Sequence, residues 1–225
     1  RTLKKKEIKL NLILKKINKR IKNNLFVDLK KINSSNGNTT INFFNSEIKL
    51  NYKIKNNIIS FFSEESKVNK NNVKIEGFVN YAPFFYDLNI KLKKVDAIKV
   101  FYNFLKIEKF FQKDILLNSN FNGKVSFNID YLSNAKFFNK ASLKLIFMNG
   151  KLFFDQSSLI LDEISRLEVV DGQLVETKNE RKLNAKFNLQ ILDEKKFYQK
   201  LQVSKANRKP IKNIYFEIQK NLNDD

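Results

Sequence analysis

Residues 183–191 read LNAKFNLQI, a stretch in which every second side chain is apolar and the side chains between are mostly polar. Residues 124–131, KVSFNIDY, show the same alternation. Successive side chains of a β-strand point to opposite faces of the sheet, so this period of two predicts strands with one polar and one apolar face. The pattern recurs at residues 8–14, 48–55, 73–80, 88–93, 143–148 and 214–219. It predicts a mainly β fold built on one long, curved, antiparallel, amphipathic sheet.

Turn signals place these strands next to one another along the chain. Asn-Gly and Asp-Gly pairs favour the left-handed backbone angles of two-residue hairpin turns. They occur at Asn149-Gly150, Asp171-Gly172, Asn36-Gly37 and Asn122-Gly123, the last of which reads as a turn or as a break within one strand. Hairpins imply antiparallel pairing of neighbours. No internal repeat with a fixed period of tens of residues is evident.

Two segments have helical rather than strand periodicity. Asp96 is a candidate cap for a helix at about 96–106, and Asp193 for a helix at about 193–203. The first helix separates two halves: residues 1–105, a β half with a basic start, and residues 114–225, a second β region. Two short helices cannot cover a sheet of about eleven strands, which would extend about 50 Å. The apolar face therefore needs another cover: a second sheet layer, closure into a barrel, or a groove that holds a ligand.

Composition argues against most enzyme classes. Cys, His and Trp are absent, which removes disulfides, imidazole bases and the Cys and His patterns of zinc sites. The five glycines lie far apart and form no phosphate-binding loop. Adjacent acids such as Asp162-Glu163 and Asp193-Glu194 would point to opposite faces of a strand, so we interpret them as turn and cap residues. We predict a non-enzymatic protein without catalytic residues, metal or cofactor.

The formal charge of +20 raises the question of a polyanionic partner. Lysines alternate with apolar residues in many strands, a pattern typical of a solvated face, and we do not expect nucleic acid to be the partner. The densest basic stretch, residues 4–31, would be attracted to anionic head groups at a membrane surface. The 22 Phe and 7 Tyr could form a stacking platform, but most Phe residues are in phase with the aliphatic ones, which favours a core or lipid contact.

The chain begins at Arg1 and contains no apolar run near the roughly 20 residues that cross a bilayer. We therefore expect a fragment or processed piece without its own anchor or signal peptide.

The second half resembles a known family in the stretches FNGKVSFNIDYLS, ASLKLIFMNGKLFFDQSSLIL and LEVVDGQLVETKNERKLNAKFNLQIL, followed by DEKKFYQKLQV and IKNIYFEIQKNL. These stretches are similar to the C-terminal β-groove region of AsmA-like and TamB-like bacterial envelope proteins. The resemblance covers residues 121–223 closely and the first half only by strand pattern.

The resemblance implies a periplasmic protein tethered to the inner membrane through a segment absent from this chain. It further implies a β-groove that shields acyl chains and serves lipid transfer and outer-membrane biogenesis. The expected partners are a phospholipid or other acyl-chain ligand, a membrane surface and an envelope protein. The family's pattern carries no catalytic residues.

Strand phase selects the candidate groove-lining residues on the apolar face. They are Val125, Phe127, Ile129, Leu143, Leu145, Phe147, Leu152, Phe154, Phe187 and Leu189. The alternatives are a basic, β-rich nucleic-acid-binding module, a structural β-sandwich scaffold and a membrane-spanning β-barrel. A barrel would be expected to carry aromatic girdles and to end in a strand whose last residue is aromatic. This sequence ends in Asn223-Asp224-Asp225 instead.

Overall fold

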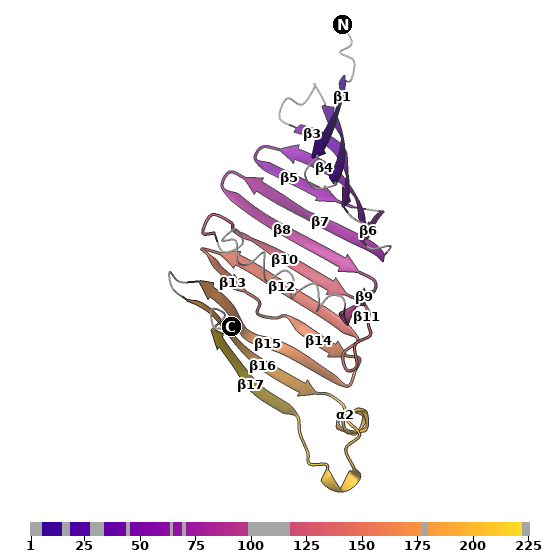
Figure 1. Ribbon diagram of the computed structural model, residues 1–225, viewed down its shortest axis with the longest axis vertical. Helices are drawn as coiled ribbons and strands as arrows, with labels where there is room; N and C mark the ends of the chain where they lie inside the picture. The colour runs from indigo at the N-terminus through magenta and orange to yellow at the C-terminus, as the bar shows by residue number, and fades with distance from the viewer. Residues whose placement is uncertain are drawn as a thin grey trace. The chain divides into compact units, whose positions relative to one another are not determined.

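The computed structural model describes residues 6–14, 19–27, 34–43, 46–63, 65–68, 71–98, 118–176 and 180–221. The chain divides into two compact units, unit 1 (Arg1–Lys93) and unit 2 (Lys94–Asp225). In each unit neighbouring strands lie side by side and antiparallel, so the mainly β, antiparallel class is confirmed (Figure 1). The predicted boundary at residues 105–114 lies outside the described residues, and the division between the units falls before it.

The strands of unit 1 follow the order β1-β2-β3-β4-β5-β7-β8, and β6 pairs with both β4 and β7. The basic N-terminal stretch contributes the first two of these strands. The strands are β1 (Lys6–Leu14), β2 (Lys19–Val27), β3 (Ser34–Phe43), β4 (Ser46–Lys55), β5 (Ile58–Phe62), β6 (Ser66–Val68), β7 (Asn71–Tyr81) and β8 (Phe84–Leu92).

The main sheet of unit 2 follows the order β10-β12-β13-β15-β16-β17, and β14 pairs with β12 and β15. A separate parallel pair joins β9 and β11. Among the described residues of unit 2, the long strands therefore form one layer. The strands are β9 (Val95–Asp96), β10 (Gly123–Ile129), β11 (Leu132–Ser133), β12 (Lys140–Met148), β13 (Lys151–Phe153), β14 (Ser158–Leu161), β15 (Ser165–Glu176), β16 (Arg181–Ile191) and β17 (Asn213–Asn221).

One of the two predicted helices is described. Helix α2 (Glu194–Lys200) begins after Asp193, whose carboxylate accepts a hydrogen bond from the Lys196 backbone N–H at 3.0 Å. That bond, helped by the Lys196 side chain, holds the Asp193 pKa below its usual range. The charged cap therefore stabilises the helix at neutral pH, and its contribution is lost as the pH falls through the lowered pKa. A 3-10 turn, η2 (Lys205–Asn207), follows. Residues 99–106 of the predicted helix at 96–106 lie outside the described residues, and its predicted cap, Asp96, is the last residue of β9.

The predicted turns had mixed outcomes. Asn149-Gly150 forms the hairpin turn between β12 and β13, and both residues have positive φ angles. The turns predicted at Asn36-Gly37 and Asp171-Gly172 are wrong, because these pairs lie inside β3 and β15. Gly123 is the first residue of β10.

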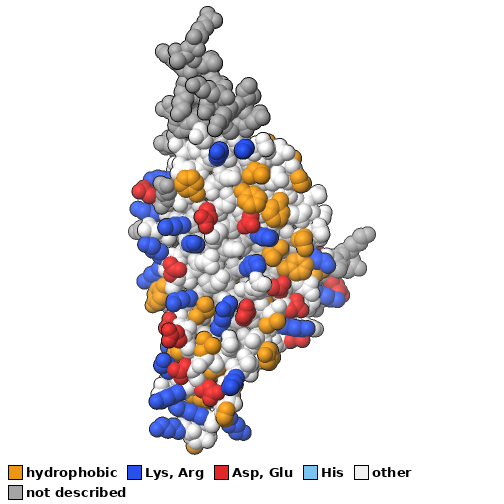
Figure 2. Space-filling view, turned by 180° about the vertical axis from the view of Figure 1, so that it is seen from behind, with side chains coloured by type: hydrophobic (Ala, Val, Ile, Leu, Met, Phe, Trp, Pro, Cys, Tyr) orange, Lys and Arg blue, Asp and Glu red, His pale blue; other side chains and the backbone are white. Residues whose placement is uncertain are grey.

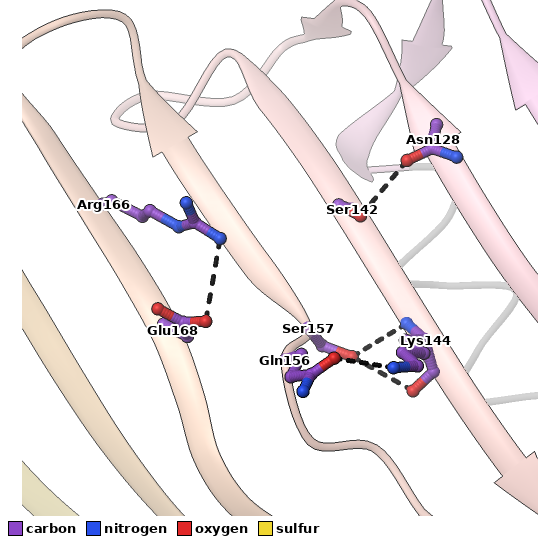
Figure 3. Close-up of polar contacts among 7 residues, drawn as sticks. All are labelled: Asn128, Ser142, Lys144, Gln156, Ser157, Arg166 and Glu168. Atoms are coloured by element: carbon purple, nitrogen blue, oxygen red, sulfur yellow. Dashed lines mark hydrogen bonds and ion pairs between the residues drawn. The ribbon is translucent and has the colours of Figure 1, made fainter.

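Both units contain a strand that is interrupted in mid-course and bridged by a serine. In unit 1 the interruption separates β5 from β6, and the Ser66 hydroxyl accepts from the Lys49 N–H at 2.8 Å and donates to the Lys49 carbonyl at 3.2 Å. In unit 2 it separates β13 from β14, and Ser157 bonds Lys144 in the same way at 2.9 and 3.3 Å (Figure 3). Each hydroxyl takes the place of the missing strand residue, so the neighbouring main chain keeps its hydrogen bonds.

The two interruptions share further features, although the sequence shows no repeat. Each lysine stands between two apolar residues of the strand that precedes the hairpin, and each hairpin begins with an Asn at φ 53°, Asn56 or Asn149. The spacing from lysine to serine differs between the units, so no fixed period appears in the sequence. The units therefore share one structural device: a hairpin followed by a broken strand with a serine bridge.

We expect Ser157→Ala to destabilise unit 2 by about 1–3 kcal/mol, because it leaves a backbone donor and acceptor of Lys144 without their partner. Urea unfolding of the full chain measures the loss, and hydrogen exchange at the Lys144 amide should accelerate.

Ser142→Ala is the matched control. The Ser142 hydroxyl bonds only a side chain in the contacts drawn in Figure 3, the Asn128 amide oxygen at 3.2 Å, so its loss should change stability by no more than about 0.5 kcal/mol. Equal effects of the two substitutions would contradict the bridging role of Ser157.

Candidate functional site

Cross-strand register places the strand residues among the predicted candidates on one face of the unit 2 sheet. Val125 pairs with Leu145 and Phe127 with Leu143 between β10 and β12. Phe147 pairs with Leu152 between β12 and β13. Residues paired across an antiparallel ladder share a face, so these strands present a common apolar surface.

The remaining candidates belong to the same face. Phe187 and Leu189 of β16 stand opposite Val169 and Leu167 of β15. Ile129 is opposite Ala141. Phe154 lies just after β13, and its ring stacks over Gly172, which is paired with Ala185 on this face. We call the whole surface the apolar face of unit 2.

Both ends of the apolar face are closed. At one end Phe147 and Leu152 are buried, and the Phe121 ring packs edge-on against Phe147 with the ring centroids 6.0 Å apart. At the other end Ile129 and Ile191 are buried. There the Phe137 ring packs edge-on against Phe197 of helix α2, with the ring centroids 5.9 Å apart. These ends are ordinary protein core.

Between the closed ends runs a strip of partly exposed apolar side chains that crosses the sheet from β10 to β17, which we call the central band. Leu143 is 37 % exposed, Ile214 38 % and Phe216 43 %, and the other members are partly buried. The central band comprises Val125, Phe127, Leu143, Leu145, Leu159, Leu167, Phe187, Leu189, Ile214 and Phe216. Val169, opposite Phe187, is buried and is not part of it.

Sequence reasoning missed the part of this face that β14 and β15 supply. A bulge between Val169 and Asp171 leaves Val170 without a cross-strand partner. The apolar face is therefore made by odd-numbered residues up to Val169 and by even-numbered ones from Gly172 onward. This change of phase hid Leu167 and Leu174. The Asp171-Gly172 pair, which predicts a hairpin turn, lies instead at this phase change within β15.

Gly172 is required by packing on the apolar face. A Cβ atom there would lie 2.4 and 2.5 Å from two ring atoms of Phe154 and 2.7 Å from a methyl carbon of Val169. The Gly172 N–H donates to the Asp155 carboxylate, and its carbonyl accepts from the Phe154 N–H at 2.9 Å. The loop at the broken strand is thus fastened to the bulge, and Phe154 fills the space that a side chain would occupy.

The opposite face of unit 2 is mostly polar, although Ile146, Met148 and Phe153 also lie on it. Lys144 donates to the side chain of Gln156 at 2.6 Å, and Arg166 lies 3.6 Å from Glu168 on the same strand (Figure 3). Charged side chains of both signs are interspersed over the face shown in Figure 2. Such exposed pairs contribute little stability each, but they keep this face in water.

Unit 1 carries an open hollow of about 500 Å³ over β3, β4 and β5. Its polar rim comes from alternate residues of these strands, which lie opposite one another in the register. They are Asn36, Asn38, Asn51, Lys53 and Ser60. Tyr52, Phe61 and Phe62 also line the hollow, so its surface combines polar and aromatic side chains.

No constellation with evident bond chemistry appears in the described ranges. Asp162 lies in a turn and Asp193 caps α2, as predicted. Ser46 and Lys49, which have the spacing of some acyl-transfer sites, both lie in β4 and point to opposite faces. The described residues contain no group of three or more acidic side chains arranged to hold a metal ion.

Comparison of the chain with known protein families, with curated proteins and with solved structures finds no match. The resemblance to AsmA-like proteins stays a prediction. Within the described ranges no helix is long and apolar enough to span a bilayer.

We expect Gly172→Ala to destabilise the chain by about 1–3 kcal/mol, because the added methyl group overpacks the contact with Phe154. The cost should fall when the substitution is made in a Phe154→Ala background, since the ring that it meets is gone. Urea unfolding of the four proteins in this cycle measures the coupling. An unchanged cost of Gly172→Ala in both backgrounds would show that another contact requires the glycine.

Proposed function

We propose that this chain is a non-enzymatic lipid-binding protein and that the central band of unit 2 holds the acyl chain of a phospholipid or similar ligand. The observation that carries the proposal is the pattern of exposure on the apolar face: closed at both ends and open along one strip. Exposed apolar surface gains about 25 cal/mol for each Å² that a ligand removes from water. A contiguous strip of this kind is typical of a binding surface.

The dimensions of the central band suit an acyl chain. It crosses β10, β12, β14, β15, β16 and β17, which at about 4.8 Å per strand gives about 24 Å. One leaflet of a bilayer contains about 15 Å of hydrocarbon, half of its total apolar thickness. The central band is therefore long enough for the chain of a common phospholipid.

Aromatic side chains at the β16–β17 end of the central band supply flat apolar contacts. The rings of Phe187 and Phe216 are stacked, with centroids 4.8 Å apart and planes 13° apart. Phe216 still exposes 43 % of its surface. A stacked pair of this kind presents a rigid apolar wall, which suits a flexible hydrocarbon chain better than a defined polar ligand.

The proposal extends to the place of action, on the strength of the sequence resemblance. An AsmA-like protein would work in the periplasm, tethered to the inner membrane through another segment, and would serve lipid transfer and outer-membrane biogenesis. The single layer formed by the long strands in the described part of unit 2 agrees better with a groove than with a β-sandwich scaffold.

The test is detergent-free purification of the full chain followed by native mass spectrometry and uptake of a fluorescent phospholipid. We expect bound phospholipid in the wild type. We expect Leu143→Glu to weaken uptake at least tenfold, because an acyl chain on the central band would bury an unpaired carboxylate.

Met148→Glu is the matched control. Met148 is in the same strand, is 49 % exposed and faces the opposite side of the sheet, so uptake should be unchanged. Circular dichroism confirms that both variants fold. Absence of both co-purified lipid and uptake in the wild type would refute the proposal, as would equal loss in the two variants.

A further inference from the structure

Residues 193–212 of unit 2 form a small lobe of strongly basic character between β16 and β17. Over these residues the sequence contains seven basic residues and two acidic ones, Asp193 and Glu194, and Asp193 pairs with Lys196 at 3.2 Å. The side chains of six lysines are exposed. Figure 2 shows blue side chains near the lower end of the molecule. These lysines are Lys195, Lys196, Lys200, Lys205, Lys209 and Lys212. We call this region the basic lobe.

The basic lobe is a folded structure rather than a loose linker. Two side chains of α2, Phe197 and Tyr198, are buried. The Tyr198 hydroxyl donates to the Lys209 carbonyl, which fastens the returning chain to the helix. Arg208 donates through two nitrogens to the Val203 carbonyl, at 3.1 and 2.9 Å. The fold therefore holds the lysines of the helix and those of the following loop close together.

Exposed aliphatic side chains accompany the lysines. Leu201, at the end of α2, is 46 % exposed, and Leu192, just before the cap, is 56 % exposed. On the helix the exposed lysines Lys195, Lys196 and Lys200 share the side opposite Phe197 and Tyr198, as expected at 100° per residue. By the same geometry Leu201 lies on the side of Phe197 and Tyr198, so the lysine side of α2 presents charge rather than a mixture of charge and aliphatic surface.

We infer that the basic lobe docks on the surface of a membrane that contains anionic phospholipid. The lysines would lie at the head groups, so the attraction is electrostatic. Nucleic acid is a less suitable occupant, because the aromatic rings that could stack on bases, Phe197 and Tyr198, are buried. Docking does not depend on acyl-chain binding by the central band.

The experiment measures sedimentation of the full chain with phosphatidylcholine vesicles, with and without phosphatidylglycerol. We expect binding only to the anionic vesicles, weakening as salt rises. The triple variant Lys200→Gln, Lys205→Gln, Lys209→Gln should bind about a hundredfold more weakly at low salt, because each lysine near the surface contributes about fivefold. These lysines are chosen because none takes part in the α2 cap.

The matched control is a second triple variant, Lys124→Gln, Lys151→Gln, Lys186→Gln. It removes the same charge from exposed positions on the polar face of the sheet and should bind anionic vesicles within about twofold of the wild type. Equal loss in both triple variants would overturn the inference, since attraction would then follow net charge alone.

Two further measurements separate docking from other activities. A fluorescent single-stranded oligonucleotide at physiological salt tests the nucleic-acid alternative: loss of oligonucleotide binding in the lobe variant, with vesicle binding intact, would overturn the inference. Leu143→Glu should dock like the wild type even where it fails to take up lipid, so failure of the central band and failure of the basic lobe give different results.

Discussion

Cross-strand register is the constraint on which the rest of unit 2 depends. Because side chains alternate along a strand, pairing Phe127 with Leu143 and Leu167 with Leu189 commits every neighbouring residue to one face or the other. A slip of one residue would place lysines among the apolar side chains and leave phenylalanines in water. The apolar face, its closed ends and its open central band all follow from this one arrangement.

The irregular positions protect the register instead of weakening it. At the broken strand between β13 and β14, Ser157 supplies the hydrogen bonds that Lys144 would otherwise lose. On the neighbouring strand a bulge changes the phase, and Gly172 leaves room for the Phe154 ring. Ser66 and Lys49 repeat the first device in unit 1. At each interrupted strand a serine hydroxyl therefore replaces the missing cross-strand hydrogen bonds of the neighbouring main chain.

The two proposals assign different physical tasks to different parts of unit 2. The central band offers contiguous apolar surface and few charges, so its affinity would come from removing hydrocarbon from water. The basic lobe offers clustered positive charge with two exposed leucines, so its affinity would come from anionic head groups and would fall with salt. A protein with both surfaces could meet a lipid at a membrane and hold its chain without any change in covalent bonds.

Alternation by itself determined the strand content and the face of nearly every candidate, because apolar residues such as Phe187 and Leu189 are two positions apart. The antiparallel pairing was predicted from four turn signals, of which Asn149-Gly150 forms a hairpin turn. Local chemistry also determined the Asn149-Gly150 turn and the Asp193 cap. The tertiary structure decided what depends on neighbours distant in sequence: the bulge that brings Leu167 and Leu174 onto the apolar face, the strand position of Gly172, and the serine bridges. It also decided which apolar residues are buried and which stay partly exposed, since burial depends on packing that no local pattern contains.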